Sequence, residues 1–361
     1  MPDMSRSLPV LAREAPASAP ARPRGWGLGP SWPRLVDGRG RAYTYLRLSL
    51  TDRCDMACVY CMPPSGEEDH ALRRELLTFE EIVRLVDVFV RSGVRRVRLT
   101  GGEPLVRKDI VRLVAMLSGV GVEEIVMTTN AGRLAQLAGP LRDAGLRGVN
   151  ISIDSLEAER FARITRGGSL PDVLCGIHAA LDAGLEVKLN CVALAGVNDD
   201  EIGALVDFAW ARGITPRFIE LMPLGEAAKL PAAMFLRAQD IAAALGDRLA
   251  EGGWKSAEGR GPARYAMRAD GSGAKVGFIT AISDEFCESC NRVRVTAAGD
   301  MRACLASRRA VSLRDLMRAG ASDVDVAWAI QWSLDSKDEG HRFTDVGEVE
   351  HTRVGMSLIG G

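Results

Sequence analysis

The feature that most constrains the fold is a regular alternation of strand-like and helix-like patterns through the middle of the chain. Short runs rich in β-branched residues, which predict strands, lie at 94–100, 124–129, 148–154, 186–192 and 215–221. Amphipathic stretches, which predict helices, lie at 78–92, 107–118, 134–144, 170–183 and 199–212. A further strand pattern covers 43–50. Such alternation is typical of βα units that build one parallel sheet. Six strands of this kind predict a partial (β/α)6 barrel of the TIM type.

The sequence divides into three predicted parts. Residues 1–40 contain seven of the 16 prolines together with many Ala and Arg residues, which predicts a disordered tail because little apolar surface is available for burial. Residues 41–225 form the predicted barrel. In residues 226–361 the alternation stops, and this region is predicted to be a C-terminal extension. It contains a predicted β-hairpin at 265–267 and 276–280, a predicted helix over 313–334, and a Gly-Gly end.

Charge and hydrophobicity exclude several classes of protein. Lys and Arg number 46 against 47 for Asp and Glu, so the chain has no general positive field for nucleic acid or anionic lipid, and an anionic ligand must be bound by a few local side chains. Uncharged stretches are much shorter than the roughly 20 residues that a membrane helix requires. The sequence also lacks the P-loop pattern for phosphate binding. We therefore expect no membrane span and no nucleic-acid partner.

A first cysteine cluster lies directly after the first predicted strand. Cys54, Cys58 and Cys61 have the spacing C-x3-C-x2-C. Three thiolates can hold three irons of a four-iron cluster, which ordinarily takes four cysteines, so one iron stays open to a small molecule. A zinc site with a distant fourth ligand and chance clustering are the alternatives. Clustered cysteines without a signal peptide favour metal binding in a reducing cytoplasm.

The cluster and the strand that follows it resemble the radical S-adenosylmethionine superfamily. Tyr60 stands at the aromatic position of that superfamily's cysteine fingerprint, and Gly101-Gly102-Glu103-Pro104 resembles the element that binds the methionine amino group. The resemblance implies a [4Fe-4S] cluster at the mouth of the barrel and S-adenosylmethionine as its ligand.

A second cluster consists of Cys287, Cys290 and Cys304, again without a nearby fourth cysteine. A zinc ribbon is the natural alternative, but it requires four ligands. A second cluster with an open iron, next to Arg292 and Arg294, would place a Lewis acid beside an anion-binding pair and suit a nucleotide.

With this second cluster and the Gly-Gly end, residues 43–361 resemble the GTP 3′,8-cyclase family of molybdenum cofactor biosynthesis. The resemblance implies two [4Fe-4S] clusters, the second carried by the extension across the barrel opening, and conversion of GTP to 3′,8-cyclo-7,8-dihydroguanosine 5′-triphosphate. It implies S-adenosylmethionine contacts at Tyr60, Gly102, Ser152 and Met222, GTP contacts at Arg47, Arg98, Thr129, Lys188, Arg292 and Arg294, and catalytic roles for Arg47, Arg292 and Arg294. It also implies an electron donor, a downstream cyclic pyranopterin monophosphate synthase, and a monomer or homodimer.

Two other functions remain open from the residues alone. One is a radical S-adenosylmethionine enzyme with an auxiliary cluster that acts on a peptide, and the other is a zinc-binding structural module. Single positions also have simpler interpretations, since Lys188 could be a solvent-facing strand residue and Met222 a core residue. Cys175 and Cys191 lie outside the clusters among apolar neighbours, and we expect both to be buried.

Overall fold

A 12-stranded, mostly parallel sheet forms the centre of the protein. The computed structural model describes residues 18–27, 32–65, 70–256, 261–307, 309–340 and 356. The strand order is β12-β11-β10-β1-β2-β3-β4-β5-β6-β9-β8-β7, and neighbouring strands from β10 to β9 are parallel. The strands are β1 (Tyr45–Ser49), β2 (Arg96–Thr100), β3 (Glu124–Thr129), β4 (Leu146–Ser152), β5 (Glu186–Val192), β6 (Thr215–Ile219), β7 (Lys255–Ser256), β8 (Arg264–Met267), β9 (Lys275–Ile279), β10 (Arg292–Val295), β11 (Asp300–Arg302) and β12 (Val311–Ser312).

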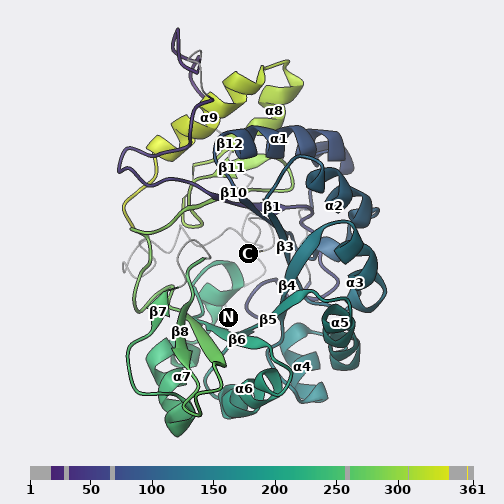
Figure 1. The fold of residues 1–361 in the computed structure, drawn as a ribbon, viewed down its shortest axis with the longest axis vertical. Helices are drawn as coiled ribbons and strands as arrows, with labels where there is room; N and C mark the ends of the chain where they lie inside the picture. Colours follow the sequence, from purple (N-terminus) through teal and green to yellow (C-terminus); the bar gives the residue numbers. More distant parts are fainter. Residues whose placement is uncertain are drawn as a thin grey trace, which may run out of the picture.

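Helices cover the outer face of this curved sheet, as an open barrel requires (Figure 1). They are α1 (Phe79–Arg91), α2 (Ile110–Ser118), α3 (Leu134–Asp143), α4 (Ala158–Thr165), α5 (Leu170–Asp182), α6 (Ile202–Trp210), α7 (Ala238–Leu245), α8 (Leu313–Arg318) and α9 (Asp323–Asp335). The predicted α/β barrel is confirmed. The C-terminal region extends it, because β9 pairs with β6 and β10 pairs with β1.

Local sequence explains the helices well, and α1 is an example. Thr78 accepts a hydrogen bond from the Glu81 amide and Glu81 accepts one from Thr78, which satisfies two amides at the helix start. Ile82, Leu85 and Phe89 then recur on one face and are buried against the sheet. Gly93 has φ +105°, a conformation that glycine adopts without strain, and it ends the helix before β2.

Strand periodicity decides which residues enter the barrel. In β1, Leu46 and Leu48 are fully buried in the apolar core, whereas Arg47 lines the barrel cavity. Successive side chains of a strand point to opposite faces, so a one-residue shift would exchange the apolar layer for the polar interior.

The prediction that residues 1–40 form a disordered tail is wrong for part of this segment. Leu35 is buried in the core, Trp32 donates to the Ser92 hydroxyl, and Val36 forms a β-bridge with Ala42. Tertiary contacts therefore order residues 32–40 despite their composition. Residues 1–17 and 28–31 lie outside the described residues.

Several other elements differ from the sequence prediction. The single helix expected over 313–334 is two helices, because Gly320 adopts φ +86° and Ser322 caps the start of α9. The short strands β10, β11 and β12 and the helices α4 and α7 were not predicted. Cys191 is buried as expected, but Cys175 is exposed on α5. Within the described ranges, no helix has the length and apolar character needed to cross a membrane.

Candidate active site

The two cysteine triads lie at opposite ends of the parallel strands. Cys54, Cys58 and Cys61 follow the carboxyl end of β1, whereas Cys290 precedes β10, which runs parallel to β1. Cys304 follows β11, which is antiparallel to β10, and so returns to the same amino end. The extension therefore carries the second triad at the amino end of β10, which continues the sheet beside β1.

One cavity of about 330 Å³ lies between the triads and is lined by both. It also brings together nearly all the side chains that the resemblance assigned to ligands, namely Arg47, Tyr60, Arg98, Gly102, Thr129, Ser152, Met222, Arg292 and Arg294. The triads thus face a shared space, as predicted. None of the described His, Cys, Asp and Glu side chains form a group of three or more placed to hold a single metal ion.

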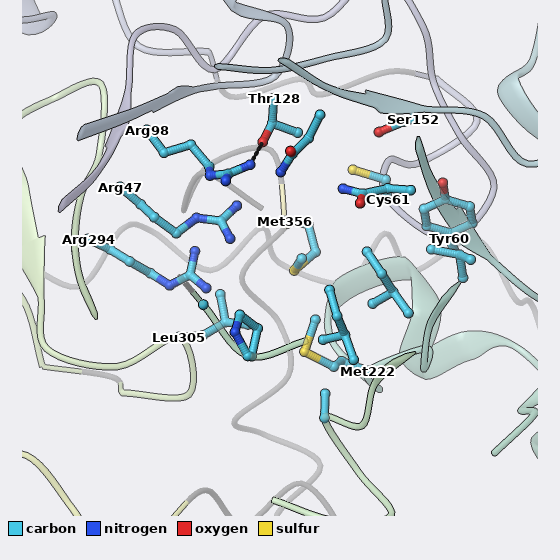
Figure 2. Close-up of a pocket in the computed structure, with 18 of the residues that line it drawn as sticks. Arg47, Tyr60, Cys61, Arg98, Thr128, Ser152, Met222, Arg294, Leu305 and Met356 are labelled. Atoms are coloured by element: carbon cyan, nitrogen blue, oxygen red, sulfur yellow. Dashed lines mark hydrogen bonds between the residues drawn. The ribbon is translucent and has the colours of Figure 1, made fainter. Parts of the chain in front are cut away.

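Three arginines form a row across adjacent strands in this cavity. Arg47 pairs in register with Arg294 on β10 and with Arg98 on β2. Figure 2 shows the three side by side on one wall, opposite Ser152, Cys61 and Tyr60. Burial together with the neighbouring arginines lowers the pKa of Arg47 well below its usual value and that of Arg294 to about 10. Buried positive charge of this density favours an anionic ligand.

The arginine row is held by side-chain contacts within the barrel. The Arg98 guanidinium donates to the Tyr45 hydroxyl and, at 3.1 Å, to the Thr128 hydroxyl. Burial raises the pKa of Tyr45, but Arg98 and Arg47 outweigh it and the net shift is downward. Arg98 therefore has a fixed orientation toward the cavity.

The Gly-Gly-Glu-Pro element packs directly against the first cysteine loop. An added Cβ at Gly102 would lie 2.3 Å from the Arg53 carbonyl oxygen, and one at Gly101 would lie 2.6 Å from that of Thr51. The amides of Gly102 and Glu103 donate to these same two carbonyl groups. The glycines are therefore required for backbone packing next to Cys54, as well as for access of a ligand.

Glu103 joins three segments beneath the first triad. Its buried carboxylate accepts hydrogen bonds from the Leu105 amide, the Asn130 amide and the Thr129 hydroxyl at 2.7–2.9 Å. Burial nonetheless raises the pKa of Glu103 to about 7. Because the Thr129 hydroxyl donates to Glu103 and already accepts from the Ala131 amide at 3.0 Å, it has a single acceptor site left for a ligand in the cavity.

Tyr60 is anchored on the far side of the first triad. Its hydroxyl donates to Asp154 at 2.6 Å, and Asp154 also accepts from the Val192 amide. Burial raises the pKa of Asp154 to about 6 and that of Tyr60 well above its usual value. Ser152 ends β4 two residues before Asp154. Ser152 and Asp154 therefore line the cavity together with Tyr60, which is hydrogen-bonded to Asp154.

The two triads have opposite electrostatic surroundings. Burial raises the pKa of Cys54 to about 12, and the nearby carboxylates of Glu103 and Asp55 contribute in the same direction. Burial also acts on Cys290, but Arg292 and Lys337 outweigh it and lower its pKa to about 6. Both triads offer the soft thiolate donors that iron-sulfur clusters use.

Lys188 is the predicted ligand residue that the main cavity does not include. It lines a smaller cavity of about 70 Å³, where its ammonium pairs with Glu186 at 2.5 Å. Arg98, Asn150 and Arg217 line both cavities and so form the layer between them.

Sequence reasoning missed Arg217 and Asn190, which are hydrogen-bonded at 2.7 Å inside the barrel. Both lie in predicted strands. Their alternation with buried Phe218 and Cys191 was a usable signal for their inward orientation.

The fold and the first triad define the class of protein. Residues 48–209 match the family described as Radical SAM superfamily, and residues 214–343 match the family described as Molybdenum Cofactor Synthesis C. A parallel barrel with Cys54, Cys58 and Cys61 after its first strand is thus that of a radical S-adenosylmethionine protein. Its cofactors are a [4Fe-4S] cluster and S-adenosylmethionine, and the three thiols after β1 fit such a cluster by type and number.

Curated relatives narrow this class. The chain is 45% identical to the GTP 3′,8-cyclase of Paracoccus denitrificans over 86% of this chain and 90% of the relative, and 45% identical to that of Heliobacterium modesticaldum over 91% and 100%. The protein of Brucella canis with the same name is 42% identical over 91% and 96%. The chain belongs to the GTP 3′,8-cyclase family.

Solved structures with low sequence identity share the fold. SuiB of Streptococcus suis bound to its precursor peptide SuiA is 16% identical, with a TM-score of 0.58 over 82% of this chain and 67% of SuiB. The structure of SuiB bound to S-adenosylmethionine gives a TM-score of 0.56 over 81% and 68%.

Proposed function

We propose that this chain is a GTP 3′,8-cyclase, converting GTP to 3′,8-cyclo-7,8-dihydroguanosine 5′-triphosphate in molybdenum cofactor biosynthesis. The observation that carries the proposal is one cavity with a cysteine triad at each end and a row of three arginines between them. Family membership and the names of the curated relatives support it.

S-adenosylmethionine would bind at the first triad. Cys54, Cys58 and Cys61 would hold the cluster, and the ligand would contact Tyr60, Gly102, Ser152 and Met222, which line the same end of the cavity. Bound at this end of the cavity, the reduced cluster and S-adenosylmethionine would supply the radical chemistry that the conversion of GTP requires. The chain's own contribution is to orient both ligands and to exclude water from the buried cavity.

GTP would bind between the triads. Cys287, Cys290 and Cys304 would hold a second [4Fe-4S] cluster, which would supply a Lewis acid for the guanine end of GTP, and Arg47, Arg98, Arg292 and Arg294 would contact the nucleotide. Thr129 would act as an acceptor only, since its hydroxyl donates to Glu103. Lys188 would contact the end of GTP that extends past the layer of Arg98 and Arg217.

The experiment is an anaerobic turnover assay. Full-length protein reconstituted with iron and sulfide is incubated with reductant, S-adenosylmethionine and GTP, and 5′-deoxyadenosine and the cyclised nucleotide are quantified. Formation of both supports the proposal. Intact clusters with S-adenosylmethionine cleavage but no cyclised nucleotide would contradict it.

Matched cysteine variants separate the two ends of the cavity. Cys304→Ala should retain cleavage of S-adenosylmethionine and lose cyclisation, whereas Cys54→Ala should lose both. Cys175→Ala is the control, because this exposed thiol lies outside the cavity lining. Equal loss of both reactions in Cys304→Ala would contradict the separate roles proposed for the two cysteine triads.

The proposal also requires partners. An electron donor must reduce the first cluster, and a cyclic pyranopterin monophosphate synthase would consume the cyclised nucleotide. Free thiols in two triads require a reducing compartment, so we place the protein in the cytoplasm as a monomer or homodimer.

A further inference from the structure

A lysine outside both sequence motifs contacts the second triad. Lys337 follows the end of α9, and its ammonium nitrogen lies 3.4 Å from the sulfur of Cys290. The same nitrogen lies 4.7 Å above the ring of Tyr43, a distance that allows a cation–π interaction. Lys337 is half-buried and Tyr43 is fully buried, so the contact has limited access to water.

Residues 37–43 hold this lysine in place. The Tyr43 hydroxyl donates to Asp37 at 2.7 Å, and Asp37 also accepts from the Arg41 guanidinium at 2.6 Å. Arg41 in turn donates to the carbonyl groups of Cys287 and Asp338, at 3.0 and 3.3 Å. One arginine therefore bridges the cysteine loop and the segment that carries Lys337.

At the first triad, the donors to the Cys54 sulfur are uncharged. Cys54 accepts from the Met56 amide at 3.4 Å and from the Asn130 side-chain amide at 4.0 Å, both of them neutral donors. Cys290 receives cationic donors from Lys337 and, at 3.8 Å, from Arg292. Cys54 and Cys290 thus receive donors of different charge.

We propose that Lys337 is a positioning residue of the second cysteine site, whose ammonium donates a charge-assisted hydrogen bond to the Cys290 sulfur and makes a cluster bound there easier to reduce. This inference rests on the proposed function, because it requires a cluster at Cys287, Cys290 and Cys304. Hydrogen bonds to sulfur and local net charge are among the factors that set the potential of such clusters. A nearby positive charge stabilises the reduced form, which is the more negative one.

The test is a reductive titration of the second cluster alone, followed by electron paramagnetic resonance. A full-length background variant with Cys54, Cys58 and Cys61 replaced by alanine is reconstituted with iron and sulfide. Lys337→Met should shift the midpoint potential to a more negative value, because it removes charge and donor while keeping an unbranched side chain. Lys337→Arg should keep the midpoint potential close to that of the background variant, because the charge and the donor are retained.

A matched control is available at the start of β9. The ammonium of Lys275 lies 4.9 Å above the ring of Tyr265, and the main cavity lining does not include it. Lys275→Met therefore removes a similar lysine–tyrosine contact and should leave the potential unchanged.

The outcomes separate the two proposals. An unchanged potential in Lys337→Met, with iron and sulfide content equal to the background, overturns the role of Lys337. A background variant that binds no cluster overturns the second cluster of the proposed function, and this inference with it. Cluster loss in Lys337→Met with retention in Lys337→Arg supports the role, since a charge at this position is then needed.

Discussion

Replacing Gly102 by alanine should displace the loop that carries Cys54, Cys58 and Cys61. The new Cβ would lie 2.3 Å from the Arg53 carbonyl oxygen and 2.5 Å from its carbonyl carbon. These are backbone atoms, so no side-chain rotation can relieve the contact. Arg53 directly precedes Cys54, and any movement of its peptide group reaches the first cysteine.

The size of the effect follows from this geometry. Ordinary Cβ contacts begin near 3.4 Å, so the loop must move by about 1.1 Å, the difference between 3.4 and 2.3 Å. Overpacking of this kind costs about 1–3 kcal/mol in the free energy of unfolding. A misplacement of about 1 Å in a reacting group can lower a rate about a hundredfold.

The assay measures S-adenosylmethionine cleavage to 5′-deoxyadenosine under reductant without GTP, together with iron content and thermal unfolding of the apoprotein. Gly102→Ala should lower cleavage about a hundredfold. Gly139→Ala is the matched control, because a Cβ at this position in α3 meets no atom within 4 Å. Alanine should there be neutral or stabilise the helix by about 0.5–1 kcal/mol. Normal iron content and cleavage in Gly102→Ala would refute the packing argument.

Three further changes test other parts of the site. Arg47→Met should raise the KM for GTP about tenfold to a hundredfold, as loss of a charged hydrogen bond predicts, and leave cleavage of S-adenosylmethionine intact; an unchanged KM would remove Arg47 from the GTP site. Because burial raises the pKa of Glu103 from 4.5 to about 7, its folded state retains a proton that the unfolded state loses. The free energy of unfolding should therefore fall as pH rises from about 4.5 to about 7, by up to about 3 kcal/mol relative to that of Glu103→Gln. Parallel pH dependence of the free energy of unfolding in the two proteins would contradict this. Arg166→Met should weaken iron binding at the first triad, since Arg166 donates to the carbonyl groups of Ala57 and Met62 in that loop; iron content equal to wild type would exclude this role.

Regular periodicity made much of the fold predictable. The strands β1 to β6 and helices such as α1 were predicted because apolar spacing, caps and terminal glycines all agree locally. The strands β10 to β12 are only two to four residues long, and they form because β10 pairs with β1. Pairing between residues so distant in sequence leaves no local pattern that could predict it.

Composition was misleading at the N-terminal segment. Prolines and arginines near residues 32–40 predicted disorder, yet Leu35 and Asp37 are buried there. Order comes from contacts with distant parts of the chain, since the Trp32 side chain and the Leu35 amide both donate to Ser92 and Gln331 donates to the Val36 carbonyl group. Leu35 in the core and Trp32 packed against it thus order a segment that its composition predicted to be disordered.

The sequence by itself determined the chemistry of this protein. The spacing of two cysteine triads, the Gly-Gly-Glu-Pro element and the inward arginines are local patterns, and each predicts the kind of ligand its residues bind. Only the tertiary structure decided where these groups meet. Parallel pairing of β10 with β1 aligns Arg294 with Arg47 and places the second triad at the opposite end of the strands from the first. The same folding brings Arg41 to Cys287 and Asp338, which are 246 and 297 residues away in sequence, and Lys337 to Cys290, which is 47 residues away. Contacts between such distant residues depend on packing that no local pattern encodes.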